Sequence, residues 1–464
     1  MSPHGEANGL RVSYSGVRGI YGESLTTLVA ARFAEAFARL ATRYRPKPTV
    51  IIGRDTRPSG EELLPAVIAG LTRLPCSLID VGVVPSPTVQ VAMAELGAQA
   101  AIIVTASHNP PEWNGFKFLI GPHNIVLNGE QTRELFQLSR DASREMESPQ
   151  SSAAPSRNRE ALDAHLRRVL DQVDVEAIKR RRFKVAVDSC LGAGEEVTAS
   201  LADALGCTVV PVRVERNSEP VAAHLGALRA YVVENECDIG VAQDLDADRL
   251  ALVTETGEAI GEECTLAFAV DHLLRRFGGA APVVVRNSST SRMIDDLCAA
   301  HGAELREVRV GEVNLSQAMI ELTEQGRTVF GGEGNGGVIY PPVCFGRDSL
   351  IGIALILEYA ARAGRPLSEL HAALPQYHII KRKLEGLDGH RLDEALARVK
   401  RLFAAETLSE FDGLKFTFSD GAWCQVRPSN TEPIVRVIAE ARSPATAEQL
   451  YRQVESEVAP LLHR

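Results

Sequence analysis

Residues 100–110 read Ala-Ala-Ile-Ile-Val-Thr-Ala-Ser-His-Asn-Pro, and the rest of the chain can be interpreted from this stretch. Residues 100–104 are apolar and rich in β-branched side chains, which predicts a short buried strand. Pro110 and Pro111 cannot continue a strand ladder or the interior of a helix, so a loop begins here. Ser107 therefore lies where a core strand opens into a loop, and such a hydroxyl can be held rigidly while it faces a ligand.

Strand, polar turn and helix alternate through the first part of the chain. A helical pattern over residues 25–43 precedes a strand at 49–53, a helix at 61–72 and a further strand at 77–82. This alternation predicts a largely parallel sheet with helices on both of its faces.

The same pattern restarts twice further along the chain. Strands are predicted at 184–188 and 282–286, each followed by a polar turn and a helix, which indicates internal repetition. A polar stretch that includes the Ser- and Pro-rich residues 148–155 suits a linker between domains. From Tyr377 onward, alternating segments flank helical stretches such as 444–458, which predicts a smaller α+β domain with an antiparallel sheet.

The composition is that of an ordinary globular protein, with 45% hydrophobic and 24% charged residues. The length of 464 residues suits about three domains. With 50 basic and 60 acidic residues, the formal net charge is −10, which argues against nucleic acid as a partner. No apolar stretch is long enough to span a bilayer and no leader pattern is visible, so we expect no membrane partner and a cytoplasmic location.

The cysteine pattern indicates neither a zinc knuckle nor a dithiol redox site, because no C-x-x-C pair is present. We expect free and mostly buried thiols in a reducing compartment. The eight cysteines are Cys76, Cys190, Cys207, Cys237, Cys264, Cys298, Cys344 and Cys424.

Three aspartates alternate in the segment Asp244-Leu-Asp246-Ala-Asp248-Arg. Carboxylates at this spacing can converge on one point, and an all-oxygen cage suits a hard cation, Mg²⁺ before Ca²⁺ or Mn²⁺. A calcium EF-hand loop also begins D-x-D-x-D, and Glu255 lies at its twelfth position. Its sixth position requires glycine but holds Arg249, and both flanks are strand-like rather than helical. A solvated acidic loop is the remaining alternative, which the buried flanks disfavour, so we predict a metal site.

Two later segments suit a phosphorylated ligand that is rich in hydroxyls. Residues 427–431, Arg-Pro-Ser-Asn-Thr, offer a guanidinium, two hydroxyls, an amide and backbone N–H groups to a phosphate, with Arg436 as further support. Residues 332–337, Gly-Glu-Gly-Asn-Gly-Gly, place Glu333 and Asn335 where they can bind sugar hydroxyls. Taken alone, residues 427–431 also fit a polar hairpin turn, and residues 332–337 are only weak evidence for a sugar site.

Cationic side chains gather near the serine stretch in the sequence. Arg18 lies in Ser-Gly-Val-Arg-Gly, and Lys117 follows Ser107 closely. Arg54 and Arg57 lie on either side of Asp55. A structural ion pair with this aspartate therefore explains them as well as a role in ligand binding does.

Together, these segments resemble those of the α-D-phosphohexomutases, which include phosphoglucomutase, phosphomannomutase, phosphoglucosamine mutase and phosphoacetylglucosamine mutase. The resemblance covers nearly the whole chain and keeps the order of serine, metal, sugar and phosphate loops. It implies an α/β protein of four domains around a central cleft, with mixed sheets in three similar α/β domains and a C-terminal α+β domain. The implied domains are residues 1–152, 153–256, 257–374 and 375–464.

The resemblance also implies a reaction. Hexose 1-phosphate and hexose 6-phosphate would interconvert through a phosphorylated Ser107 and a hexose 1,6-bisphosphate, which also serves as activator, with Mg²⁺ as cofactor. The implied metal ligands are Ser107, Asp244, Asp246 and Asp248. The implied catalytic residues are Ser107, His108, Lys117, Arg18 and Arg249, with either Lys117 or His108 as general base. The implied substrate-binding residues are Glu333, Asn335, Arg427, Ser429, Asn430, Thr431 and Arg436.

Two loops depart from the usual family pattern. The sugar loop has Asn335 and Gly337 where the bacterial pattern G-E-x-S-G-H has Ser and His, and it resembles the archaeal-type form G-E-x-N-G-G. Residues 13–19 read Ser-Tyr-Ser-Gly-Val-Arg-Gly in place of G-T-S-G-x-R-G. Glucosamine phosphate is expected ahead of mannose or glucose phosphate, in a monomer or homodimer. A sugar-phosphate phosphatase or bisphosphate synthase and a non-catalytic sugar-phosphate sensor are the alternatives.

Overall fold

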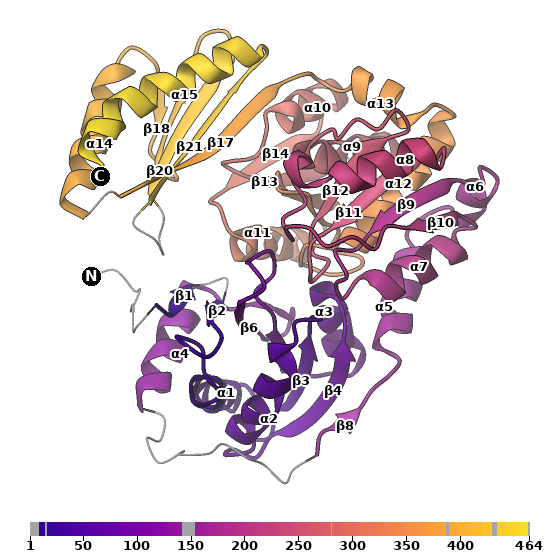
Figure 1. The fold of residues 1–464 in the computed structure, drawn as a ribbon, viewed down its shortest axis with the longest axis vertical. Helices are drawn as coiled ribbons and strands as arrows, with labels where there is room; N and C mark the ends of the chain where they lie inside the picture. Colours follow the sequence, from indigo (N-terminus) through magenta and orange to yellow (C-terminus); the bar gives the residue numbers. More distant parts are fainter. Residues whose placement is uncertain are drawn as a thin grey trace.

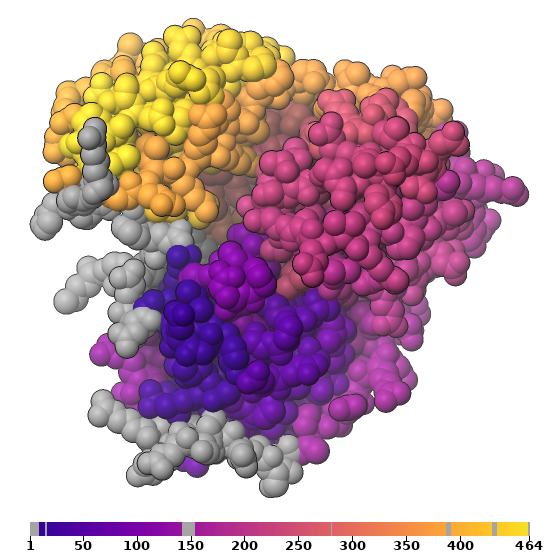
Figure 2. Space-filling model, in the orientation of Figure 1, coloured from indigo at the N-terminus to yellow at the C-terminus, as the bar shows by residue number. Residues whose placement is uncertain are grey.

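The computed structural model describes residues 9–13, 16–141, 154–279, 281–386, 389–428 and 434–462. Over these residues it contains four β-sheets, each with its own helices, which form four domains (Figure 1). The surface is hollowed between the C-terminal domain and the second domain, where both lie over the first domain (Figure 2). Within the described residues, no helix has the length and apolar character needed to cross a membrane.

The first domain has one mixed sheet that is covered by helices on both faces. In chain order its elements are β1 (Arg11–Ser13), β2 (Gly16–Ile20), α1 (Thr27–Ala41), β3 (Thr49–Arg54), α2 (Ser59–Leu71), β4 (Ser77–Val83), α3 (Ser86–Glu95), β5 (Ala100–Val104), β6 (Trp113–Ile120), β7 (Ile125–Val126), α4 (Gly129–Asp141) and β8 (Ser156–Arg157). Helices α1 and α2 pack on one face of the sheet and α3 on the other.

The strands of this first sheet are only partly parallel. They lie in the order β1-β2-β6-β5-β3-β4-β8, with β7 beside β6. Strands β3, β4, β5 and β8 run parallel, as the alternation of strands and helices predicts. The prediction of a largely parallel sheet is wrong for the remainder, because β6 returns antiparallel to β5 and β2 pairs antiparallel to β6. The connection from β5 to β6 is too short to hold a crossover helix, so the two strands form a hairpin.

The second and third domains share one topology. The second contains α5 (Ala161–Leu170), α6 (Val175–Lys179), β9 (Lys184–Asp188), α7 (Glu195–Ala204), β10 (Thr208–Pro211), η1 (Ala222–His224), α8 (Gly226–Glu234), β11 (Ile239–Gln243) and β12 (Leu250–Thr254). The third contains α9 (Glu262–Arg276), β13 (Val283–Asn287), α10 (Met293–His301), β14 (Glu304–Val308), α11 (Glu312–Glu324), β15 (Val329–Glu333), β16 (Gly337–Ile339), α12 (Ser349–Ala363) and α13 (Leu367–Ala373). Their strand orders are β10-β9-β11-β12 and β14-β13-β15-β16, with the last strand antiparallel in each.

The first domain contains the same four-stranded unit in the order β4-β3-β5-β6. This shared order agrees with the internal repetition indicated by the sequence. In each unit, one predicted functional segment joins the third strand to its antiparallel partner. Ser107 lies between β5 and β6, the three aspartates lie between β11 and β12, and Asn335 lies between β15 and β16.

The fourth domain is an antiparallel sheet with two helices, as predicted. It contains β17 (His378–Glu385), α14 (Gly389–Leu402), β18 (Thr407–Ser409), β19 (Leu414–Thr417), β20 (Trp423–Pro428), β21 (Ile434–Ala441), α15 (Pro444–Val458) and η2 (Ala459–Leu461). The strand order is β17-β21-β20-β19-β18. This domain has a hydrophobic core of its own.

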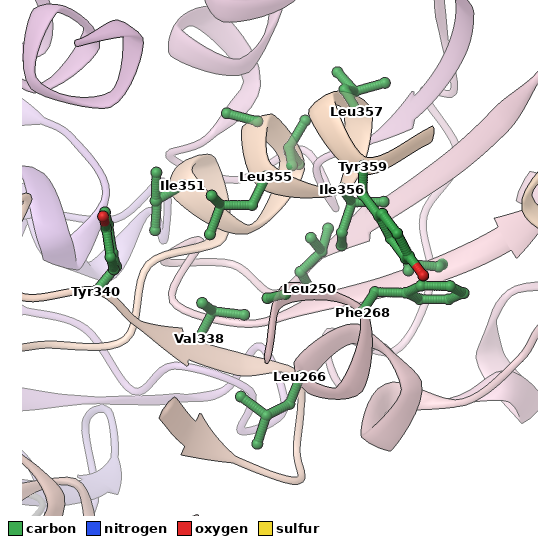
Figure 3. Packing of buried hydrophobic residues seen from close by; sticks show 14 of the residues in the cluster. Leu250, Leu266, Phe268, Val338, Tyr340, Ile351, Leu355, Ile356, Leu357 and Tyr359 are labelled. Carbon is green, nitrogen blue, oxygen red and sulfur yellow. The ribbon is translucent and has the colours of Figure 1, made fainter. Parts of the chain in front are cut away.

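The second and third domains, in contrast, share one large hydrophobic core (Figure 3), and each also has a smaller buried cluster of its own. Leu250 of β12 lies among Val338 of β16 and Ile351 of α12 in this cluster. The backbone N–H of Leu250 also donates to the carbonyl of Gly336 at 3.0 Å. Because Leu250 directly follows the aspartate segment and Val338 follows the glycine-rich segment, this core fixes the two segments relative to each other.

We expect Leu250→Ala to lower the free energy of unfolding by about 2–5 kcal/mol, because it opens a cavity in a fully buried site. Urea unfolding followed by fluorescence and circular dichroism would measure the change. The control is Val233→Ala, whose side chain is 54% exposed and should matter little. A Leu250 variant as stable as that control would contradict the shared core.

Candidate active site

Ser107 is held in a left-handed backbone conformation at the end of β5. Its φ is +51°, a conformation that costs energy for a residue with a side chain and persists only where the surroundings impose it. The N–H of Ser107 donates to Thr105 Oγ1 at 2.9 Å, and Thr105 Oγ1 donates to Asp55 Oδ2 at 2.6 Å. Asp55 is fully buried, and burial raises its pKa to about 6 despite the nearby Arg57.

Arg57 fixes the same loop from the loop that follows β3. Its Nη1 donates to the carbonyls of Pro110 and Trp113 at 2.6 and 2.8 Å, and its Nη2 donates to those of Ser107 and Asn109 at 2.8 and 2.6 Å. Its Nε lies 3.3 Å from Asp55 Oδ2. The ion pair considered from the sequence is therefore present, but the four backbone contacts were not foreseen.

Arg54 does not take part in this arrangement of the serine loop. Its Nη2 lies 3.1 Å from Glu61 Oε1 at the surface, and its Nη1 donates to the carbonyl of Asp55.

The three aspartates converge, as their spacing predicts. Asp244, Asp246 and Asp248 are buried, and carboxylate oxygens from all three lie within 4.8 Å of one another. Asp244 Oδ2 accepts a hydrogen bond from Ser107 Oγ at 3.0 Å, so the metal loop of the second domain meets the serine loop of the first.

Donors within the protein hold further oxygens of this cluster in place. Asp244 Oδ1 accepts from the backbone N–H groups of Asp248 and Arg249, both at 3.1 Å. Asp246 Oδ2 accepts from Ser86 Oγ at 2.5 Å and from Lys117 Nζ at 2.6 Å. The hydroxyl of Ser86 and the ammonium of Lys117 both come from the first domain.

The remaining oxygens fit a bound cation. Asp246 Oδ1 and Asp248 Oδ1 are buried without a hydrogen-bond partner among the described residues, which is costly unless an ion satisfies them. Burial raises the pKa of Asp244, and the charges of Asp248 and Asp246 raise it further. A divalent cation would relieve this repulsion, and hard carboxylate oxygens suit Mg²⁺.

Lys117 bridges two of these carboxylates. It lies on β6, where it pairs in register with Ile103 of β5, and its Nζ lies 2.6 Å from Asp246 Oδ2 and 2.7 Å from Asp248 Oδ2. Burial alone would lower the pKa of Lys117, but the two aspartates raise it well above its usual value. Lys117 is therefore a cation in this arrangement.

His108 lies beside the Ser107 hydroxyl, and two arginines contact neighbouring residues of the site. The Nδ1 atom of His108 lies 3.4 Å from Ser107 Oγ. Arg249, burial and Arg18 together hold the pKa of His108 well below its ordinary value, so the imidazole is neutral. Arg18 Nη1 donates to Asn109 Oδ1 at 2.7 Å, which attaches β2 to the serine loop. Arg249 Nε lies 3.9 Å from Asp244 Oδ2.

The glycine-rich loop brings its two polar side chains together. Asn335 Nδ2 donates to Glu333 Oε2 at 3.0 Å, and Asn287 Nδ2 donates to Glu333 Oε1 at 2.9 Å. Arg347 Nη1 also donates to Glu333 Oε2, at 2.9 Å. Asn287 and Arg347 were missed in the sequence, since no local motif marks them and their partners lie far along the chain.

The predicted phosphate loop is described only at its two ends. Arg427 on β20 and Arg436 on β21 are direct partners across the antiparallel ladder, so two guanidinium-bearing residues flank the turn. Like charges placed opposite each other repel, and a bound anion would offset that repulsion. The predicted residues Ser429, Asn430 and Thr431 lie outside the described residues.

Comparison with known proteins gives one consistent family. Models of phosphoglucomutase/phosphomannomutase alpha/beta/alpha domains I, II and III match residues 11–145, 163–257 and 262–377, and the C-terminal domain model matches residues 380–457. The chain belongs to the α-D-phosphohexomutase family. The members of this family are isomerases, so the protein is an enzyme of that class.

Individual relatives of this phosphohexomutase match along nearly their full length. A phosphoglucomutase/phosphomannomutase of Thermococcus kodakarensis is 38% identical over 94% of this chain and 95% of its own. A protein named "Probable phosphoglucosamine mutase" from Methanopyrus kandleri is 34% identical over 94% and 95%. A phosphoglucomutase/phosphomannomutase family protein from Burkholderia thailandensis has a crystal structure that superposes with a TM-score of 0.80, at 26% identity over 97% and 99%.

The fourth domain reaches the sugar loop through an ion pair between a partly exposed lysine and a buried glutamate. Lys381 of β17 places Nζ 2.6 Å from Glu263 Oε1 and donates to the carbonyl of Gly334 at 2.8 Å. The N–H of Ser291 donates to Glu263 Oε2 at 3.0 Å. Burial raises the pKa of Glu263 from 4.5 to about 7, although Lys381 opposes the shift.

This raised pKa predicts a pH dependence of stability. The folded protein binds the Glu263 proton more tightly than the unfolded chain, so stability falls as the pH rises from 4.5 to about 7. Over that range, the free energy of unfolding of wild type should fall relative to that of Glu263→Gln, which does not titrate. Urea midpoints at a series of pH values would measure the difference, and parallel curves for the two proteins would contradict the prediction.

Proposed function

We propose that this enzyme is a Mg²⁺-dependent phosphohexomutase that interconverts hexose 1-phosphate and hexose 6-phosphate through a phosphorylated Ser107. The observation that carries the proposal is the contact between Ser107 Oγ and Asp244 Oδ2, at 3.0 Å, close to oxygens of Asp246 and Asp248 that have no hydrogen-bond partner in the described part of the chain. A hydroxyl held rigidly against a cation site is the machinery that phosphoryl transfer requires, since that reaction depends mainly on alignment and charge stabilisation.

In the proposed reaction, the phosphoryl group leaves Ser107 Oγ and bonds to a sugar hydroxyl oxygen. A phosphoserine carries about −1.5 to −2 charge at neutral pH. Mg²⁺ held by Ser107, Asp244, Asp246 and Asp248 would neutralise part of this charge as a Lewis acid. The guanidinium groups of Arg18 and Arg249 face the same loop and add positive charge near the transferring group.

His108 is our proposed general base. It is neutral and its Nδ1 lies 3.4 Å from Ser107 Oγ, so it can take the proton that the attacking sugar hydroxyl loses. Lys117 is the weaker candidate because two carboxylates keep it protonated. We assign Lys117 to holding Asp246 and Asp248 in place.

The sugar bisphosphate formed in the first transfer must turn end for end and return a phosphoryl group to Ser107. Glu333 and Asn335 would hold the sugar hydroxyls, while Arg427, Ser429, Asn430, Thr431 and Arg436 would hold the phosphate that is not reacting. Added hexose 1,6-bisphosphate would act as activator, because it phosphorylates Ser107. The fourth domain would close over the substrate and exclude water, which would otherwise hydrolyse the phosphoserine.

For the sugar, we propose glucosamine phosphate ahead of glucose or mannose phosphate, on the archaeal-type form of the sugar loop. Relatives named for both activities support a hexose phosphate substrate.

The eight cysteines all lie in the described residues and are all free, which fits a cytoplasmic enzyme.

A coupled assay tests this function. Glucosamine, N-acetylglucosamine, glucose and mannose 1-phosphates would each be supplied with Mg²⁺ and a trace of the bisphosphate. We expect the 6-phosphate to form, and Ser107→Ala should abolish turnover while sugar-phosphate binding measured by calorimetry stays within a few-fold of wild type. Release of inorganic phosphate in step with substrate loss would instead indicate a phosphatase. Full activity of Ser107→Ala would contradict the mechanism, and binding without turnover would indicate a sensor.

The assignment of His108 as base predicts the effect of His108→Gln. Its kcat should fall about 100-fold with little change in KM, because the proton loses its acceptor while the sugar contacts remain. Steady-state kinetics at saturating bisphosphate would measure it, with His378→Gln at the exposed surface of β17 as control. A kcat close to that of the control would rule out His108 as the base.

A further inference from the structure

Arg347 joins parts of the site that come from two domains. It precedes α12, and its buried guanidinium lies among three carboxylates. Its Nη2 donates to Asp248 Oδ2 at 2.7 Å, its Nη1 to Glu333 Oε2 at 2.9 Å and its Nε to Glu312 Oε2 at 3.1 Å. Every nitrogen of the planar fork is thus used, so one rigid group sets the positions of the three carboxylates relative to each other.

On the side of the metal loop, this contact determines which oxygen of Asp248 is left for a cation. Oδ2 accepts from both Arg347 and Lys117, whereas Oδ1 is buried without a hydrogen-bond partner among the described residues. Fixing one carboxylate oxygen fixes the direction of the other. Groups that orient a ligand from behind commonly alter metal affinity by 10- to 100-fold.

On the side of the sugar loop, the same guanidinium holds Glu333. Oε2 of Glu333 accepts from Arg347 and from Asn335, and Oε1 accepts from Asn287. The carboxylate is therefore fixed at both oxygens before any sugar arrives. The proposed sugar-binding carboxylate of Glu333 and the proposed metal ligand Asp248 therefore bond to the two terminal nitrogens of one guanidinium.

Neighbouring residues determine the position of Arg347. Asp348 caps α12, where its Oδ1 accepts from the N–H of Leu350 at 2.8 Å, and its own N–H donates to the carbonyl of Val338 at 2.8 Å. A Cβ atom added at Gly337 would overlap Cδ of Arg347. Gly337 is also one of the two positions at which the sugar loop departs from the bacterial pattern, and here its missing side chain makes room for the arginine.

We propose that Arg347 is a positioning residue that couples the sugar loop to the metal loop, with Gly337 as the residue that admits it. One substitution at a residue that contacts neither ligand directly would then weaken both Mg²⁺ and sugar-phosphate binding. The sugar half of this inference rests on the proposed function, whereas the metal half needs only the cation.

Two variants test the coupling without removing charge. Arg347→Lys keeps the positive charge but cannot reach three acceptors, and Gly337→Ala removes no charged group while its methyl displaces the arginine. The matched controls are Arg327→Lys, whose pair with Glu304 is partly exposed, and Gly226→Ala, where an added Cβ meets nothing within 4 Å. Circular dichroism would verify that each variant is folded, and Gly337→Ala carries the test if Arg347→Lys does not fold.

The readouts are Mg²⁺ affinity, measured by calorimetry on the sugar-free protein, and KM for the hexose 1-phosphate that the coupled assay identifies. For each folded variant we expect Mg²⁺ to bind about tenfold more weakly. We expect KM to rise by about the same factor, with both controls unchanged. The inference would be overturned if a folded variant bound Mg²⁺ with an affinity within twofold of wild type, or more tightly. It would also be overturned if the KM of the variant lay within twofold of the wild-type value.

A failure of the proposed function would give different results from a failure of the inference about Arg347. If wild type isomerises no hexose phosphate, that function is wrong, but the calorimetric comparison still decides whether Arg347 orients the metal ligand. If wild type is active and the variants match it in both readouts, the inference about Arg347 is wrong and the function stands.

Discussion

The ion pairs of Lys117 are the interaction on which the arrangement of the site depends. Lys117 belongs to the first domain, and both of its carboxylate partners, Asp246 and Asp248, belong to the second. Without this cation, Asp246 would lose its ion pair, and Asp248 would keep only its arginine contacts to offset the repulsion from the neighbouring carboxylates. With it, the serine loop and the aspartate loop are held within hydrogen-bond distance across a domain boundary.

Ion pairs also connect the second domain to the third. Glu333 and Glu312 of the third domain add two more carboxylates. Arg347 forms ion pairs with both of them and with Asp248. The first three domains are thus connected through buried charges, and the second and third also share a hydrophobic core. The fourth domain contacts the third through polar pairs such as Lys381 with Glu263, and interfaces of that kind permit relative motion more readily than apolar ones.

Much of the architecture could be predicted from the sequence because its signals are local. The strands at 49–53, 77–82, 100–104, 184–188 and 282–286, and the helix at 444–458, are all confirmed within a residue or two. The spacing of the three aspartates was enough to predict that they converge. The antiparallel return of β6 was missed, because an apolar segment does not reveal the direction of its partner.

The residues that support the site could not be predicted in the same way. Arg57 binds carbonyls about 50 positions away, and Arg347 binds an aspartate about 100 positions away, so neither has a motif of its own. In the sequence, such Arg and Ser residues cannot be distinguished from exposed polar residues, because their partners become neighbours only in the folded protein. Ser86, which donates to Asp246 from the start of α3, is a third example.

The equivalent placement of three functional segments has a consequence for how such an enzyme changes over time. Serine loop, aspartate loop and glycine-rich loop each close a hairpin at the same point of a repeated four-stranded unit. Each repeated unit therefore carries its connecting turn at the same point, and Ser107, Asp244 and Glu333, on or beside these turns, are all buried. Because Ser107 bonds Asp244 and one guanidinium bonds both Asp248 and Glu333, a change in any one of these segments is also felt by the segment that it contacts.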